Sequence, residues 1–141
     1  MKIKFIIALV LLLTPVISIA QKKIKTSIFQ DENSATTEIK LKTAKSNLDN
    51  AFEAYNENKL EKAKYFIDQS QRQDVKLGDF YFLLGAYMYR TKEFKAANRY
   101  WKISHKEGGC WECKELLDNI ENDKIIEKLI NEKVINYLNE K

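Results

Sequence analysis

The sequence predicts an all-α fold built from antiparallel helical hairpins that stack on one another. Apolar residues recur at i, i+3, i+4 and i+7 through most of the chain, which is the periodicity of helices with one buried face. After residue 20 the chain contains no proline and four glycines, so few residues interrupt its helices. The order of small and large residues also repeats at a fixed spacing of about 34 positions, the repeat period, which is typical of a helical-hairpin array.

The N-terminal segment has the three regions of a secretory signal. A positive start with two lysines is followed by an apolar run over residues 5–13, and Ser18 and Ala20 place small residues where a signal peptidase requires them. We therefore expect a signal peptide over residues 1–20, cleaved between Ala20 and Gln21, and a mature chain that is periplasmic or secreted. An uncleaved membrane anchor is the alternative, although the apolar run is shorter than the roughly 20 residues of a spanning helix.

The mature chain has the length of one domain with a modest core. Loss of the leader, which holds two lysines and no acids, changes the formal net charge from +4 to +2. Lysines and glutamates alternate along the chain without a basic block, so we expect a solvated helical surface, and export makes nucleic acid an improbable partner. We expect a flexible arm over residues 21–35 and a helical domain over residues 36–141.

The helical domain divides into two hairpins and a terminal pair. The first hairpin, about residues 44–77, turns at residues 56–59, and the second, about residues 78–111, turns at residues 91–93. Asp79 is expected to cap the first helix of the second hairpin. Residues 112–140 supply two further helices, and these are expected to cap the stack with their outer lysines and glutamates facing water.

The two hairpins superpose when one is shifted by the repeat period, which places Ala51 on Gly85. Three equivalent pairs are identical, and the others keep small residues opposite small residues and large residues opposite large ones. The pairs are Ala51 and Gly85, Tyr55 and Tyr89, Leu60 and Phe94, Ala63 and Ala97, Ile67 and Trp101, and Ser70 and Ser104.

The second hairpin resembles a tetratricopeptide repeat (TPR). The resemblance is carried by Tyr81-x-x-Leu84-Gly85, followed by Tyr89, Phe94, Ala97 and Trp101. The first hairpin departs from the pattern at Asn47 and Asn50, where an aromatic residue and a leucine are usual. The resemblance implies a short right-handed solenoid of TPR-like hairpins with a C-terminal capping helix pair, in which Gly85 and Ala97 face each other across a close crossing of two helices.

The same resemblance implies that the first helix of each hairpin lines a concave face that binds another protein or a peptide. Carried onto this sequence, the partner-binding residues are Leu48, Phe52, Tyr55, Phe82, Tyr89 and Arg90. Aromatic and arginine side chains are enriched at such surfaces. The alternative is that Phe52 and Phe82 pack against each other or against the terminal pair.

The sharpest local motif is Cys110-Trp111-Glu112-Cys113, which holds the only two cysteines. Cysteines three apart in a helical turn have Cα atoms about 5–6 Å apart, within the disulfide range, and an exported protein meets oxidising surroundings. A structural disulfide is the leading interpretation. The alternatives are a redox pair, a haem attachment site with Lys114 in place of the usual histidine, part of a zinc site, and free thiols.

The sequence favours a binding protein over an enzyme. Its single histidine, His105, suits a surface position, and no Ser/His/Asp, Cys/His, phosphate-loop or H-E-x-x-H pattern is present. We expect no cofactor and no metal. Two alternative functions are a redox or haem accessory protein using Cys110 and Cys113, and a structural subunit of an envelope complex. A weak homodimer through the C-terminal helix is a further alternative, with Ile126, Leu129 and Ile130 forming the seam.

Overall fold

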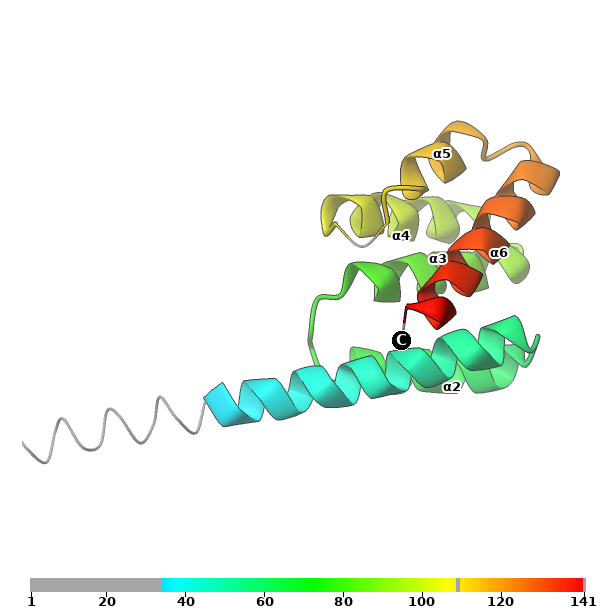
Figure 1. The fold of residues 1–141 in the computed structure, drawn as a ribbon. Helices are drawn as coiled ribbons and strands as arrows, with labels where there is room; N and C mark the ends of the chain where they lie inside the picture. Colours follow the sequence, from blue (N-terminus) through cyan, green and yellow to red (C-terminus); the bar gives the residue numbers. More distant parts are fainter. Residues whose placement is uncertain (1–33, 109, 141) are drawn as a thin grey trace, which may run out of the picture. The chain divides into compact units, whose positions relative to one another are not determined.

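The computed structural model describes residues 34–108 and 110–140. Most of the described residues are helical and the rest form turns, bends and short connecting segments; no strand occurs among them (Figure 1). Residues 1–39 form one unit and residues 40–141 another, and the account below concerns the second. The expected signal peptide and all but the last two residues of the expected arm lie outside the described residues. Those two, Ser34 and Ala35, are already helical.

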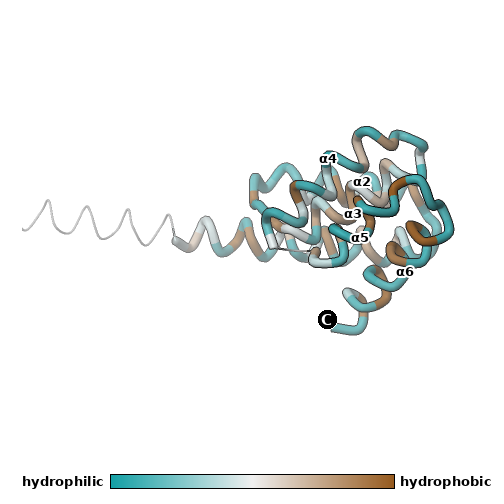
Figure 2. The backbone as a smooth tube through the Cα atoms, turned by 90° about the horizontal axis from the view of Figure 1, so that it is seen from above, coloured by the Kyte–Doolittle hydropathy of each residue, from teal (hydrophilic) through white to brown (hydrophobic). Residues whose placement is uncertain are grey.

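Six helices make up this part of the chain, counting the N-terminal helix, whose described part within the second unit covers residues 40–56. The others are α2 (Leu60–Gln71), α3 (Gly78–Arg90), α4 (Phe94–Lys106), α5 (Cys113–Asp118) and α6 (Asp123–Asn139). Hydrophobic and hydrophilic residues alternate along each helix (Figure 2), as expected of helices with one buried face. None of the described helices is both long enough and apolar enough to cross a membrane.

The two hairpins adopt the same backbone conformation at positions one repeat period apart. Their turns place a non-glycine residue at positive φ at equivalent positions, with φ of 58° at Asn58 and 65° at Lys92. The segments that leave the hairpins also have positive φ at equivalent positions, 53° at Asp74 and 79° at Gly108, where the second is a glycine. Because an L-residue adopts positive φ at some cost, this shared geometry reflects the same turn built twice.

Two buried serines repeat the same hydrogen bond. The Ser70 hydroxyl donates to the Ala44 carbonyl at 3.0 Å, and the Ser104 hydroxyl donates to the Gly78 carbonyl at 2.7 Å. Donor and acceptor are both shifted by one repeat period between the two bonds. Each bond joins the second helix of a hairpin to the first, so it fixes the register of the two helices. These two bonds therefore recur at the spacing of the sequence repeat.

Small residues allow the helices of each hairpin to approach closely. Ala51, Ala63 and Ala97 have no exposed surface, as the repeat predicted. The indole of Trp101 fills the space beside Gly85, because a Cβ built on Gly85 would lie 2.5 Å from two of its ring atoms.

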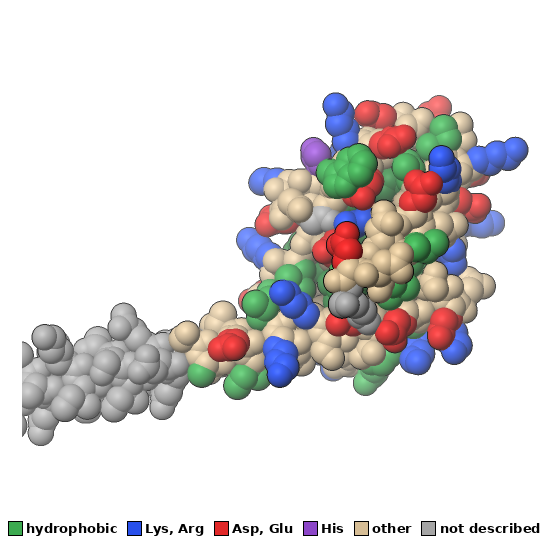
Figure 3. Space-filling view, viewed as in Figure 1, with side chains coloured by type: hydrophobic (Ala, Val, Ile, Leu, Met, Phe, Trp, Pro, Cys, Tyr) green, Lys and Arg blue, Asp and Glu red, His purple; other side chains and the backbone are tan. Residues whose placement is uncertain are grey.

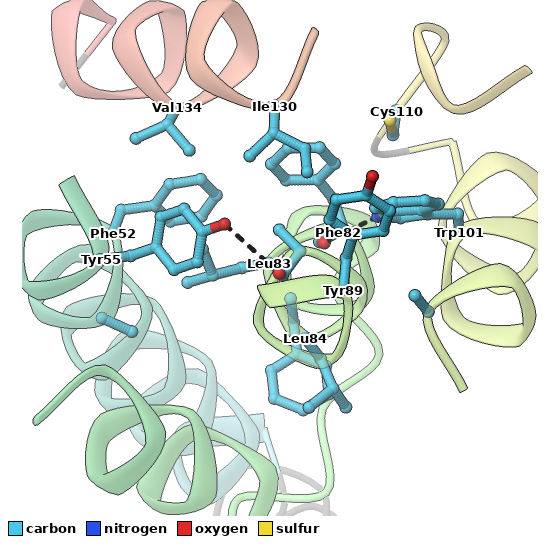
Figure 4. Packing of buried hydrophobic residues seen from close by; sticks show 14 of the residues in the cluster. Phe52, Tyr55, Phe82, Leu83, Leu84, Tyr89, Trp101, Cys110, Ile130 and Val134 are labelled. Atoms are coloured by element: carbon cyan, nitrogen blue, oxygen red, sulfur yellow. Dashed lines mark hydrogen bonds between the residues drawn. The ribbon is translucent and has the colours of Figure 1, made fainter. Parts of the chain in front are cut away.

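Trp101 anchors α4 to α3. Its side chain is fully buried, and its indole Nε1–H donates to the Phe82 carbonyl at 3.2 Å (Figure 4). The first hairpin is joined to α3 by Tyr55, whose hydroxyl donates to the Ala86 carbonyl at 3.3 Å. A buried aromatic ring with a satisfied polar atom supplies apolar area and orientation together.

The terminal pair differs in length from the expectation for residues 112–140. Helix α5 has only six residues, whereas α6 has seventeen and runs back past α3 toward the N-terminal helix (Figure 1). The Asn122 side chain caps α6 by accepting a hydrogen bond from the Ile125 amide at 3.3 Å. Asp79 does not cap α3, because the N-cap position falls at Leu77. The Asp79 carboxylate instead pairs with Lys133 of α6 at 3.2 Å.

Candidate binding surface

The inner face of the unit is formed by the first helix of each hairpin, the N-terminal helix and α3. Five of the six residues expected to bind a partner lie on this face and are buried, with exposed fractions of 6 % or less. These are Leu48, Phe52, Tyr55, Phe82 and Tyr89. The sixth, Arg90, is exposed.

Helix α6 covers this face. Ile130 and Val134 project from α6 toward Phe52, Tyr55 and Phe82 (Figure 4). The ring of Tyr137 stacks on that of Phe52 with the centroids 3.7 Å apart. The Phe52 ring is also stacked with the Phe82 ring, and their centroids are 6.2 Å apart. The structure therefore has the arrangement in which Phe52 and Phe82 pack against each other and against the terminal helix.

Three polar contacts hold α6 along its length. The Tyr89 hydroxyl donates to the Asp123 carboxylate at the start of α6. The ion pair between Asp79 and Lys133 lies further along, and the Tyr137 hydroxyl donates to the Asp49 carboxylate at 2.8 Å near the end. Burial and the accepting carboxylates raise the pKa values of Tyr89 and Tyr137 well above the ordinary value.

The proposed dimer seam lies in this same contact. Ile126, Leu129 and Ile130 are buried within the unit, with exposed fractions of 0 %, 8 % and 2 %. A homodimer through these three residues would require α6 to leave the inner face. The exposed part of α6 contains Ile135, which is 50 % exposed.

An open groove of about 590 Å³ remains between the hairpin turns and the first half of α6. Its polar and charged lining includes Asn58, Arg90, Lys92, Asp123 and Glu127. The walls therefore carry two cations from the second hairpin and two carboxylates from α6.

Arg90 is fixed in this groove by two contacts from the first hairpin. Its guanidinium carbon lies 4.6 Å from the centroid of the Tyr55 ring, a cation–π geometry. Its Nη1 donates to the Asn58 side-chain oxygen at 2.8 Å. Burial raises the pKa of Tyr55 to about 12, although the nearby Arg90 acts in the opposite direction. Because a guanidinium has five N–H donors, the bond to Asn58 leaves others for a carboxylate in the groove.

The two cysteines form the expected bridge. Cys110 and Cys113 are disulfide-bonded, with Cα atoms 5.3 Å apart. Both are buried, with exposed fractions of 1 % and 0 %, and the Cys110 carbonyl lies 3.3 Å from the His105 Nδ1 atom. Thiol–disulfide exchange requires an attacking thiolate to reach a sulfur atom, so this burial hinders the redox chemistry considered for the motif. Trp111, between them, is 76 % exposed.

One surface feature escaped the sequence reasoning. Four cations, Lys95, Arg99, Lys102 and Lys106, are exposed along α4. They are dispersed in the linear sequence and form no basic block, but their spacing of four, three and four residues places them on one side of a helix. That spacing was the signal that could have revealed them.

Comparison with known proteins adds no relative to these observations: no family model, no curated protein and no solved structure matches the chain.

Proposed function

We propose that this chain is an exported protein–protein interaction module, built as a short TPR-like right-handed solenoid, that binds a peptide or protein segment through the Arg90 groove. The repetition of turn geometry and of serine hydrogen bonds at the repeat period supports the TPR-like architecture. The disulfide supports export, since such bridges persist in oxidising compartments. No feature of the inner face suggests a reaction, so the proposed activity is binding alone.

The observation that carries the proposal is the fixed, exposed guanidinium of Arg90. Of the six residues expected to meet a partner, it is the one that α6 leaves open. Tyr55 and Asn58 hold it before any ligand arrives, and such preorganisation lowers the entropic cost of binding. A carboxylate of the partner, from a side chain or a chain terminus, would form a charge-assisted hydrogen bond with it.

The charges around Arg90 limit what the groove accepts. Asp123 and Glu127 also line the groove, and they would repel a uniformly acidic segment while pairing with a basic residue. The proposed partner segment therefore carries a carboxylate next to a lysine or arginine. Leu60 and Phe94 provide apolar contact at the edge of the groove.

The test compares two arginine variants in the native envelope. Tagged wild type, Arg90→Ala and Arg72→Ala are expressed in the source cell, and co-purifying proteins are quantified by mass spectrometry. Arg72 is the matched control, because it is an exposed arginine at the end of α2 and does not line the groove. A protein recovered with wild type and with Arg72→Ala, but lost with Arg90→Ala, is the expected result. Equal recovery with all three rejects the groove as the binding site.

A further inference from the structure

The outer face of α4 carries charge of a single sign. Between Phe94 and Lys106 the helix contains four lysine or arginine residues and no aspartate or glutamate. With 100° of rotation per residue, Lys95, Arg99, Lys102 and Lys106 fall within about 60° of one another on the helix circumference. We call these four residues the α4 stripe.

The stripe points away from the core. The buried residues of α4 are Ala97, Trp101 and Ser104, and the same rotation places them roughly opposite the stripe. The stripe spans about 16 Å along the helix axis, from a rise of 1.5 Å per residue. Among the described residues, no ion pair involves any of its four members.

The first hairpin provides an internal comparison. Helix α2 has the same place in its hairpin as α4, yet its charges are mixed, with Glu61 and Asp68 beside Lys62 and Lys64. Lys64 and Asp68 form an ion pair at 2.5 Å. The positions equivalent to Lys95 and Lys102, one repeat period earlier, are Glu61 and Asp68. The hairpin architecture therefore does not require a basic outer face, and the stripe is particular to the second hairpin.

One face of the molecule has the pattern expected from solvation alone. On the face drawn in Figure 3, acidic and basic side chains are interspersed. Such mixing leaves little net field for a charged partner. The α4 stripe is an exception to it, which indicates a polyanionic partner.

The composition of the stripe favours an anionic lipid surface over an acidic protein. Protein partners derive most of their affinity from buried aromatic or apolar anchors, and exposed charges add little. The hollow along the stripe, about 460 Å³, is lined by three of its cations together with Asn98 and Ile103, so it offers one apolar contact. An anionic membrane surface engages all four cations at once, and each contributes independently.

An exposed aromatic ring stands at one end of the stripe. Phe94 is 47 % exposed and shares a hollow with Lys92 and Lys95. Basic residues beside a partly exposed aromatic ring are characteristic of helices that rest on a membrane surface. We propose that the α4 stripe docks this protein on a membrane surface rich in anionic headgroups; none of its four cations lines the Arg90 groove.

The experiment measures co-sedimentation of the full chain with two kinds of vesicle. One is pure phosphatidylcholine, and the other contains phosphatidylcholine and phosphatidylglycerol in a two-to-one ratio. Affinity that comes from the apolar N-terminal segment appears on both vesicles, so the difference between them isolates the electrostatic contribution. We expect tighter binding to the anionic vesicles and loss of that preference in high salt, which screens exposed charges.

Two triple variants with the same change in net charge decide which residues are responsible. Lys95→Gln/Arg99→Gln/Lys102→Gln should weaken binding to anionic vesicles by roughly 100-fold, since each cation near such a surface is worth about fivefold in affinity. The control, Lys42→Gln/Lys62→Gln/Lys114→Gln, should weaken it much less. All six side chains are exposed, and circular dichroism verifies that both variants fold.

Three outcomes overturn the proposal. The first is a wild-type chain without preference for anionic vesicles, and the second is an equal loss in the control variant, which would mean that net charge alone matters. The third concerns a polyglutamate peptide. If the wild type binds this peptide, and the stripe variant loses the peptide but still binds anionic vesicles as the wild type does, the stripe belongs to an acidic protein partner. Arg90 is not part of the stripe, and the three residues changed in the stripe variant do not line the Arg90 groove, so the two proposals fail separately.

Discussion

The indole ring of Trp101 occupies the space that a side chain on Gly85 would need. A Cβ at Gly85 would come within 2.5 Å of both the Cδ1 and Nε1 atoms of that ring. The ring has little freedom to retreat, because it is fully buried and hydrogen-bonded to the Phe82 carbonyl. The glycine thus makes room for the ring inside α3, although alanine would favour the helix by about 1 kcal/mol.

Gly85→Ala should therefore destabilise the protein, even though it improves helix propensity. We expect the free energy of unfolding in urea to fall by about 1–3 kcal/mol, which is the usual cost of overpacking a core. The first hairpin supplies the compensating change, because Ala51 and Ile67 stand at the equivalent positions. Gly85→Ala/Trp101→Ile should lose less stability than the sum of the two single variants. Additive losses would show that Gly85 and Trp101 are not coupled.

The two serine hydrogen bonds should contribute similarly to stability. Ser70→Ala and Ser104→Ala each remove a buried donor and leave a helix carbonyl without that partner, so we expect a loss of about 1–3 kcal/mol in each case. The bonds lie in different hairpins, and the double variant should show the sum of the two losses. Urea unfolding of the wild type, the two single variants and the double variant gives the four free energies of unfolding. A change in either single variant of less than about 0.5 kcal/mol, the size of an ordinary surface substitution, would contradict the role given to the serines.

These serines also show how far the sequence predicts the fold. A shift by the repeat period aligns Ser70 with Ser104, and in the structure their hydroxyls donate to carbonyls the same period apart, those of Ala44 and Gly78. Local periodicity likewise predicted the helices and the small residues between them. Such features depend on residues close in the chain or on the repeat, so a pattern in the sequence reveals them.

The position of α6 depends on contacts that no local pattern encodes. Tyr137 meets Asp49 across 88 residues, and Asp79, which was expected to cap α3, pairs with Lys133 instead. Both depend on the path of the chain after α5. The six residues expected to bind a partner were grouped through the family resemblance, and five of them are buried. Their cover by the terminal helix could be stated from the sequence only as one of two alternatives.

The disulfide should add only modest stability. It joins residues three apart, and closing so short a loop removes little entropy from the unfolded chain, about 2 kcal/mol in the chain-entropy model. Cys110→Ala/Cys113→Ala should fold with native helicity and melt at a temperature lower by roughly 10 °C. Alanine is preferred to serine here, because both positions are buried. A double variant that remains unfolded would show that the bridge is essential to the fold.

Accessibility of the bridge can be measured separately. Because both cysteines are buried, reduction of the folded protein by dithiothreitol should be slow, and it should become fast in denaturant. Mass spectrometry after thiol alkylation follows the reaction. Rapid reduction of the folded protein would instead favour the redox alternative for Cys110 and Cys113.

The N-terminal residues give a prediction about export. If Ser18 and Ala20 direct a signal peptidase, the protein recovered from the source cell begins at Gln21. Intact-mass measurement of the purified chain decides the matter, and Ala20→Arg is the matched variant that should block processing. A wild-type protein that retains Met1 and the whole apolar run would support the uncleaved anchor.

The tyrosines that hold α6 predict a loss of stability at alkaline pH. Tyr89 and Tyr137 have raised pKa values in the folded protein, and the pKa of Tyr55 is about 12. In the unfolded chain they ionise near pH 10. Below that pH these tyrosines are protonated in both the folded and the unfolded state, so their full contribution to the free energy of unfolding is present. As the pH rises above 10, the unfolded state releases protons that the folded state retains, so stability falls by up to about 1.4 kcal/mol per pH unit for each group.

Tyr89→Phe/Tyr137→Phe separates this effect from general alkaline unfolding. At pH 8 the variant should be less stable than wild type by about 1 kcal/mol for each lost hydrogen bond to Asp123 and Asp49. Above pH 10 the variant lacks the two tyrosine hydroxyls whose ionisation favours the unfolded state, so its stability declines less steeply than that of the wild type. The curves of stability against pH for the two proteins should therefore converge. Urea midpoints measured at half-unit intervals from pH 8 to pH 11.5 give both slopes. Parallel curves would mean that these hydroxyls are not held by α6 in solution, and the inner face would then be open to a partner along its whole length.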